Sequence, residues 1–290
     1  MLNFLLYALT VSIWGSTWLV ITYQLGTPVA VAVGWRFTLA AALLLAWCLA
    51  RKISLRFSPR QLFFVILQGL TNFSINYWMV YQAETRLSSG LVAVIFSLLM
   101  VFNMVGGRVF FVQRINAYGA AGAGLGLIGV LLVFWPEVAA GGNARLSGIL
   151  FALAATFFSS CGNLLSVQNQ KAGIPLIPGI TIGMAAGGLA MLALAAVSGD
   201  SLAIPLTPQF LLPLLYLSLF GSVIAFAAYL GLIRRIGAGQ ASYANVMIPM
   251  VALALSTLFE GYQWQLAAGA GLLVSFSGNL LVMRGKAKIS

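Results

Sequence analysis

Apolar residues run along the whole chain in blocks of about twenty, and each block ends at glycine, proline or charged residues. A helix needs about 20 apolar residues to cross the hydrocarbon core of a bilayer. The pattern therefore predicts ten membrane-spanning helices, and the short connections make consecutive helices antiparallel neighbours. The predicted spans are residues 2–23, 29–50, 60–81, 88–107, 116–135, 146–168, 176–198, 208–232, 239–259 and 264–283.

The composition supports this fold class and excludes several others. Hydrophobic residues make up 61% of the 290 residues and charged residues only 7%, whereas about a quarter of a soluble domain is charged. Such a chain cannot cover a water-facing surface, so a soluble enzyme, a nucleic-acid-binding protein and a disordered segment are excluded. The first block reaches Tyr23 without a basic start or a cleavage site, so we expect a retained span rather than a signal peptide.

The charges are divided unevenly between the two sides of the predicted membrane. Twelve of the fifteen basic residues, and no acidic residue, lie in connections two–three, four–five, six–seven and eight–nine and in the C-terminal tail. Because cytoplasmic loops are rich in Lys and Arg, both termini are predicted to be cytoplasmic, and the alternation supports ten spans. The other connections hold two basic residues and all four acids, which are Arg86, Arg145, Glu84, Glu137, Asp200 and Glu260.

The second half of the chain repeats short motifs of the first at an offset of about 146–149 residues. Residues 14–17 (WGST) lie opposite residues 160–163 (SCGN), and residues 128–133 lie opposite residues 277–282. Each unit holds five spans, an odd number, so the second unit enters the membrane from the opposite side. The sequence thus predicts two inverted repeats, 1–139 and 140–290, with a substrate site near the midplane and alternating access.

Several motifs resemble those of the drug/metabolite transporter superfamily, and its ten-helix EamA branch in particular. They are WGST at 14–17, Arg36-Phe37 in the second span, residues 85–90 before the fourth, and Phe259-Glu260-Gly261 before the tenth. The resemblance covers essentially the whole chain. It implies an all-α polytopic carrier of small organic metabolites, often an amino-acid exporter, in the bacterial inner membrane. It also implies a pathway among spans one, three, four, six, eight and nine, with five and ten as scaffold.

The third predicted span holds the most informative polar side chains. Gln68, Asn72 and Asn76 recur every four residues and share one helical face, with Tyr77 and Tyr81 on a neighbouring stripe. Side-chain amides at membrane depth usually face the bundle interior or a water-filled cavity. Interhelical hydrogen bonding is the alternative. We predict that Asn72, Asn76 and the two tyrosines line a substrate site.

Two further spans contribute candidate substrate-binding residues. Trp14, Ser16 and Thr17 form a small polar patch in span one, and Asn163 occupies the matching place in span six. Serine and threonine often bond only to their own helix, and Trp14 alternatively packs in the core. Span nine adds Tyr243 and Asn245 before Pro249, a residue that bends a helix and exposes carbonyls. The bend at Pro249 either shapes the transport pathway or only allows the helices to pack.

Arg36 is the one clear charge inside a predicted span, about 10 Å from the outer end. An ionisable group at that depth is a functional candidate. Three roles are open for the Arg36 side chain. It could form an ion pair with Glu84, extend outward to the membrane interface, or bind a substrate carboxylate. The pair is favoured, because the resembled family carries this arginine without needing an acidic substrate.

The remaining motifs indicate neither catalysis nor a cofactor. The chain has no histidine, its cysteines (Cys48 and Cys161) lie in apolar blocks, and the four acids lie near the outer face. No metal site, cofactor or catalytic residue is therefore expected. The GxGxxG run at 124–129 lies inside an apolar span, where glycines indicate close helix packing rather than nucleotide binding. An intramembrane lipid-modifying enzyme and a non-transporting scaffold are the alternatives to transport.

The expected partners follow from the same features. They are membrane lipids and a small-molecule metabolite, with no nucleic acid. Because one chain already contains both predicted halves, a functional monomer is expected.

Overall fold

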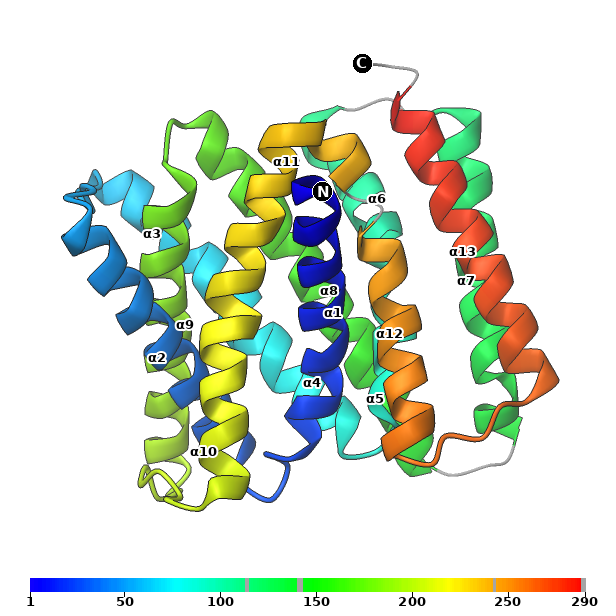
Figure 1. The fold of residues 1–290 in the computed structure, drawn as a ribbon, viewed down its shortest axis with the longest axis horizontal. Helices are drawn as coiled ribbons and strands as arrows, with labels where there is room; N and C mark the ends of the chain where they lie inside the picture. The colour runs from blue at the N-terminus through cyan, green and yellow to red at the C-terminus, as the bar shows by residue number, and fades with distance from the viewer. Residues whose placement is uncertain (113–114, 140–142, 242–243, 288–290) are drawn as a thin grey trace.

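The computed structural model describes residues 1–112, 115–139, 143–241 and 244–287, and every regular element within these ranges is helical. Seven of the described helices are long and apolar enough to cross a membrane, and two shorter apolar helices, Ala244–Phe259 and Leu266–Leu281, accompany them. The helices stand side by side and run between the same two ends of the molecule (Figure 1). The chain is therefore an all-helical, polytopic membrane protein.

Most helical elements follow the predicted apolar blocks, but the helical run of the eighth block continues to Ala241, past its predicted end at 232 and past the predicted start of the ninth span at 239. The third block becomes one continuous helical run of three elements, and so does the eighth. The α-helices are α1 (Leu2–Thr22), α2 (Val29–Ala50), α3 (Pro59–Leu70), α4 (Asn76–Glu84), α5 (Ser89–Phe96), α6 (Leu99–Phe111), α7 (Ala117–Ala139), α8 (Asn143–Lys171), α9 (Leu176–Val197), α10 (Pro208–Leu215), α11 (Ala225–Ala241), α12 (Ala244–Phe259) and α13 (Leu266–Ala287), with π-helical segments η1 (Thr71–Ile75) and η2 (Tyr216–Ile224).

Local sequence explains where the third helical run begins. The Ser58 hydroxyl accepts a hydrogen bond from the Gln61 backbone N–H at 3.3 Å, and the Gln61 side chain accepts one from the Ser58 N–H at 3.0 Å. This capping box satisfies two donors that the first turn leaves free. Pro59 at the first helical position lacks an N–H that would need a partner.

The two π-helical segments interrupt α-helical hydrogen bonding within these runs. Segment η1 joins α3 to α4, and η2 joins α10 to α11. Such segments are rare and often occur at functional sites, because one extra residue per turn redirects the side chains that follow. In the third run, η1 includes Asn72 and ends directly before Asn76.

Helices α7 and α13 form the closest-packed pair and stand at one side of the bundle (Figure 1). A Cβ added at Gly129 would meet the backbone oxygen of Gly271 at 2.5 Å, and one at Gly278 would meet that of Gly122 at 2.5 Å. The glycines therefore let the two backbones touch, as the sequence indicated for the glycine run at 124–129.

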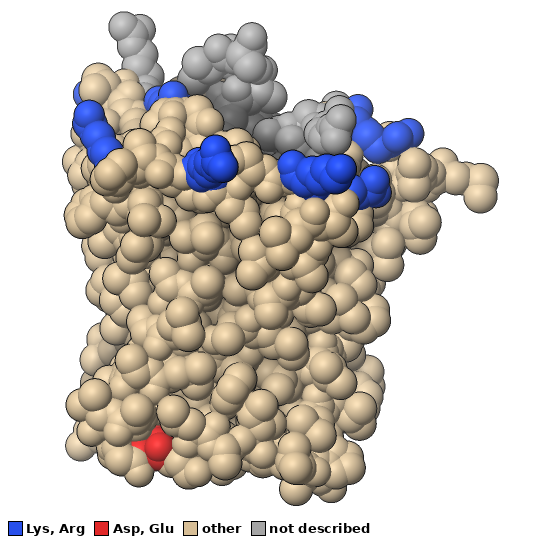
Figure 2. All heavy atoms as spheres, turned by 90° about the vertical axis from the view of Figure 1, so that its left-hand side faces the viewer, with Lys and Arg blue, Asp and Glu red and all other residues tan. Residues whose placement is uncertain are grey.

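The charges gather at the two ends of the bundle. Figure 2 shows Lys and Arg along the upper edge of one face and a carboxylate near its lower edge. In Figure 1, which has the same vertical axis, α1 begins and α13 ends at the upper end. The basic residues therefore lie at the end of the bundle where α1 begins and α13 ends.

Candidate functional site

A cavity of about 520 Å³ lies among the helices of both halves of the chain. It is reached by side chains from α1, η1, α4, α8 and α12, among others. Most of the substrate-binding residues predicted from sequence line this one cavity. They are Trp14, Thr17, Asn72, Asn76, Tyr77, Asn163 and Asn245, together with the predicted kink residue Pro249.

The lining combines side-chain amides with aromatic rings. The described residues that line the cavity carry no ionisable carboxyl, ammonium or guanidinium group. A largely apolar hollow with a few directed polar groups is the usual form of a small-molecule site. The amides are Gln68, Asn72, Asn76, Asn103, Asn163, Asn245 and Asn279, and the rings are those of Trp14, Trp18, Phe73, Tyr77, Phe96, Phe226 and Tyr229.

Asn76 is the most constrained of these amides. Its side chain is 4% exposed, and its Nδ2 donates a hydrogen bond to the Asn72 carbonyl oxygen at 3.1 Å. The Oδ1 atom is buried and has no hydrogen-bond partner in the described part of the chain. A buried acceptor without a partner costs free energy, so Asn76 Oδ1 is an unsatisfied acceptor beside the cavity.

Trp14 forms a fixed aromatic wall of the cavity. Its indole Nε1 donates to the Gly221 carbonyl of η2 at 3.0 Å, and its ring lies 5.2 Å from those of Phe226 and Tyr229. Thr17 donates its hydroxyl proton to the Trp14 carbonyl at 2.7 Å. The threonine thus bonds within its own helix, as one reading of the sequence allowed, while still lining the cavity.

Three predicted site residues lie outside the cavity lining, and a fourth falls outside the described residues. The Ser16 hydroxyl is hydrogen-bonded to the Tyr216 hydroxyl at 2.7 Å, so it joins α1 to η2. Tyr81 is fully buried and donates to Gln24 Oε1 at 2.7 Å. Arg36 also lies behind the lining, and Tyr243 falls in the undescribed stretch.

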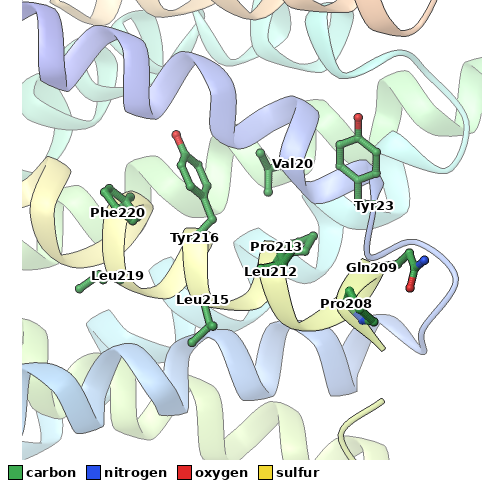
Figure 3. A pocket seen from close by; sticks show the side chains of 10 residues that line it. All are labelled: Val20, Tyr23, Pro208, Gln209, Leu212, Pro213, Leu215, Tyr216, Leu219 and Phe220. Carbon is green, nitrogen blue, oxygen red and sulfur yellow. The ribbon is translucent and has the colours of Figure 1, made fainter. Parts of the chain in front are cut away.

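A second hollow, of about 690 Å³, lies on the surface between the end of α1 and α10–η2. Figure 3 shows Leu212, Leu215 and Leu219 along this helical run and the Tyr216 hydroxyl pointing toward α1. Its other lining residues are also mainly apolar. Because few polar groups converge there, this groove lacks the directed contacts of a specific polar-solute site.

Arg36 does not form the ion pair with Glu84 that the sequence favoured. Its guanidinium carbon lies 4.5 Å from the ring centroid of Tyr77 and 5.1 Å from that of Phe37. Arg36 Nε and Nη1 and both Glu84 carboxylate oxygens are buried without a hydrogen-bond partner among the described residues. Stacking on the two aromatic faces therefore replaces the expected salt bridge.

Sequence reasoning missed several lining residues, of which Asn279 matters most. The resemblance implied that the tenth span is scaffold, yet Asn279 of α13 is 4% exposed and lines the cavity. Asn103 of α6 also lines it and accepts a hydrogen bond from the Ser160 hydroxyl at 2.9 Å. Both residues are amides inside apolar spans. This is the feature that singled out Asn72, so it could have identified them as well. No group of three metal-ligating His, Cys, Asp or Glu side chains occurs among the described residues.

Known proteins resemble this chain over nearly its whole length. The inner membrane transporter YedA of Escherichia coli strain K12 is 32% identical over 268 residues, covering 88% of this chain and 82% of YedA. Protein PagO of Salmonella typhimurium is 27% identical over 264 residues, covering 89% and 84%. A probable amino-acid metabolite efflux pump of the same organism is 24% identical over 269 residues, covering 87% and 85%.

A solved structure and a family model extend the comparison. The solved structure, a crystal structure of another protein, superposes with a TM-score of 0.69 at 16% identity over 99% of each chain, which shows a common fold. The model of the EamA-like transporter family matches residues 2–135 and residues 146–284. The resemblance carried by the short motifs is therefore confirmed, and the chain belongs to the EamA-like transporter family.

Proposed function

We propose that this protein is a secondary transporter that exports a small organic metabolite, an amino acid or a related compound, by alternating access through the central cavity. The observation that carries the proposal is the cavity itself. It is lined by side-chain amides and aromatic rings from both halves of the chain. A lipid-modifying enzyme would need a nucleophile or metal set, and a scaffold would not need polar groups at helix centres.

Several features support ten spans arranged as two inverted repeats, 1–139 and 140–290. The family model matches the chain twice, once in each half. Helix contacts occur in corresponding pairs, because α1 packs against α11 and α12 while α8 packs against α4, α5 and α6. A π-helical segment lies within the third helical run of each half. Each of these features is what a duplicated five-helix unit would produce.

The relative YedA is a transporter of the bacterial inner membrane, which supports that location for this protein, and the charge distribution supports an orientation with both termini in the cytoplasm. Lys and Arg gather at the end where α1 begins and α13 ends (Figures 1 and 2). The described acids Glu84, Asp200 and Glu260 follow or end helices that run toward the opposite end. This is the asymmetry that the positive-inside rule describes.

The lining favours a solute that carries no net charge. Amides can donate and accept hydrogen bonds with both ends of a zwitterion, and the aromatic walls suit an apolar side chain. A net ionic solute would lose its hydration without meeting an opposite charge in the lining. Both halves of the cavity come from one chain, so the proposed working unit is the monomer.

Counterflow in proteoliposomes tests the proposal. Vesicles loaded with an unlabelled neutral amino acid, such as phenylalanine or threonine, should accumulate its radiolabelled form transiently. The Asn76→Leu variant should lose this signal, while Asn143→Leu, at the exposed start of α8, should retain it. Absence of counterflow for neutral amino acids and related uncharged metabolites with the wild-type protein would contradict the proposal.

A further inference from the structure

The cavity ends at a closed layer on the side where α1 finishes. Ile21 and Val80 line the cavity. Beyond them, Gln24 and Tyr81 are 1% and 0% exposed and joined by a 2.7 Å hydrogen bond. This end lies opposite the one where α1 begins (Figure 1). In the proposed orientation, the structure is therefore closed toward the outside.

A contact between the two halves of the chain reinforces the closed end. Glu260 follows α12 and accepts hydrogen bonds from the Ser89 backbone N–H, at 3.2 Å to each carboxylate oxygen, and from the Ser89 hydroxyl at 2.5 Å. Ser89 is the first residue of α5, where free N–H groups favour an anion. The Glu260 carboxylate thus fastens the end of α12 onto the start of α5.

A second carboxyl group is buried beside this contact. Glu84, the last residue of α4, is 5% exposed, and neither of its oxygens has a hydrogen-bond partner among the described residues. The Ser88 and Ser256 hydroxyls and Gln24 Nε2, in the same part of the fold, are also buried with no partner in the part of the chain that the structure describes. Such atoms are uncommon in folded proteins and call for an explanation.

The charged and titratable groups that act on Glu84 come from three elements. Glu260, after α12, repels a negative charge on Glu84, whereas Arg36 of α2 attracts it. Tyr81, on the same helix, also interacts with Glu84. Arg36 stays outside salt-bridge distance, because its guanidinium stacks on Tyr77. The buried Glu84 carboxylate, beside the half-buried Glu260 and without a hydrogen-bond partner among the described residues, is ionised only at a cost in free energy.

We propose that Glu84 is a proton-binding site whose occupancy holds the outer end of the transporter closed. A proton from the outer solution converts the Glu84 carboxylate to a neutral carboxyl group, and the Glu260–Ser89 contact then forms without repulsion. Release of that proton places a second negative charge beside Glu260 and favours separation of α12 from α5. Closure is accordingly favoured at low pH and is lost as the pH rises.

This proton-binding role rests on the proposed function in one respect, because it requires that the outer end of the protein opens during transport. It assigns the proton as the ion that controls this step. An exporter with such a site would bind a proton after its solute leaves to the outside, and proton binding would favour its return to the inward-facing state.

Spin-label distances test the gate without any transported solute. Cys48 and Cys161 are replaced by alanine, and single cysteines are placed at the exposed Gln263, which follows α12, and at the exposed Asn143, the first residue of α8, which packs against α4 and α5. The labelled full-length protein is reconstituted in liposomes. A second, longer distance population should appear as the pH rises from 5.5 to 8.5, with the population ratio changing up to about tenfold per pH unit for one proton.

Matched carboxyl variants identify the responsible group. Glu84→Gln should keep the short distance at both pH values, whereas Asp200→Asn, an outer carboxyl beyond this cluster, should respond like the wild type. Glu260→Gln should move the transition to lower pH, because a neighbouring negative charge is removed. Identical wild-type distances at both pH values, or a full pH response in Glu84→Gln, would overturn the proposal. A pH-responsive gate without counterflow would instead count against the proposed function alone.

Discussion

The side chain of Asn72 lies so close to Gly162 that no Cβ atom fits at that position of α8. A Cβ built there would meet Asn72 Nδ2 at 2.7 Å and the amide carbon more closely still. Ordinary contacts of this kind are longer than 3.4 Å. The glycine in the second half of the chain thus sets the position of an amide that the first half presents to the cavity.

Gly162→Ala is expected to displace the Asn72 amide while leaving the protein folded, because a side-chain end can shift more easily than backbone. A solute group that bonded to this amide would lose its partner, at a cost of about 1–3 kcal/mol. Counterflow of a transported solute should show an affinity lowered about tenfold or more. Gly124→Ala, where an added Cβ meets nothing within 4 Å, is the control. Unchanged affinity in Gly162→Ala would show that Asn72 does not contact the solute.

Asn76→Leu is expected to fold normally and to lose most transport, because leucine matches asparagine in size but cannot accept the proposed hydrogen bond. Asn279→Leu is expected to impair transport as well, since Asn279 is buried and lines the same cavity. This second expectation departs from the scaffold role that the resemblance implied for the tenth span. Stable variants that exchange solute at the wild-type rate would assign both amides to helix packing.

The sequence predicted the helices better than their internal geometry. Blocks of about twenty apolar residues determine where α1, α2 and α9 begin and end, because backbone groups in lipid must be satisfied within the helix. A π-helical segment leaves no comparable mark on composition, so η1 and η2 were not predicted. The helical run from 89 to 111 also breaks at Ser97–Leu98 without a proline.

The candidate site shows the same division. Amide spacing brought Asn72 and Asn76 to one face, and the structure places both in the cavity lining. The spacing of apolar and amide residues did not predict which side chains of distant helices contact each other. The stacking of Arg36 on Tyr77 and the hydrogen bond from Ser16 to Tyr216 depend on how helices turn about their axes. Apolar periodicity determines that rotation poorly when a helix is hydrophobic on all sides.

Gly129→Ala is expected to destabilise the pairing of α7 with α13. The added Cβ would collide with the backbone of Ser275 and lie 2.5 Å from the Gly271 carbonyl oxygen, and backbone cannot move aside as a side chain can. Overpacking of this kind typically costs about 1–3 kcal/mol. Thermal unfolding in detergent should therefore begin at a lower temperature than in the wild type. Gly124→Ala on the same helix should unfold like the wild type. Equal stability of the two variants would mean that α7 and α13 can separate without cost.

Cysteine labelling in intact cells tests the proposed orientation. In a chain with Cys48 and Cys161 replaced by alanine, Gly26→Cys should react with an impermeant thiol reagent added outside. Gly26 is exposed in the connection after α1, at the end opposite the basic residues (Figures 1 and 2). Ser54→Cys should react only after the membrane is permeabilised, because it lies between Lys52 and Arg56 in a connection predicted to be cytoplasmic. Both positions are exposed in the structure, so burial would not account for a difference. Labelling of Ser54→Cys from outside, with Gly26→Cys protected, would reverse the orientation and would place the proton-binding carboxyl Glu84 on the cytoplasmic side.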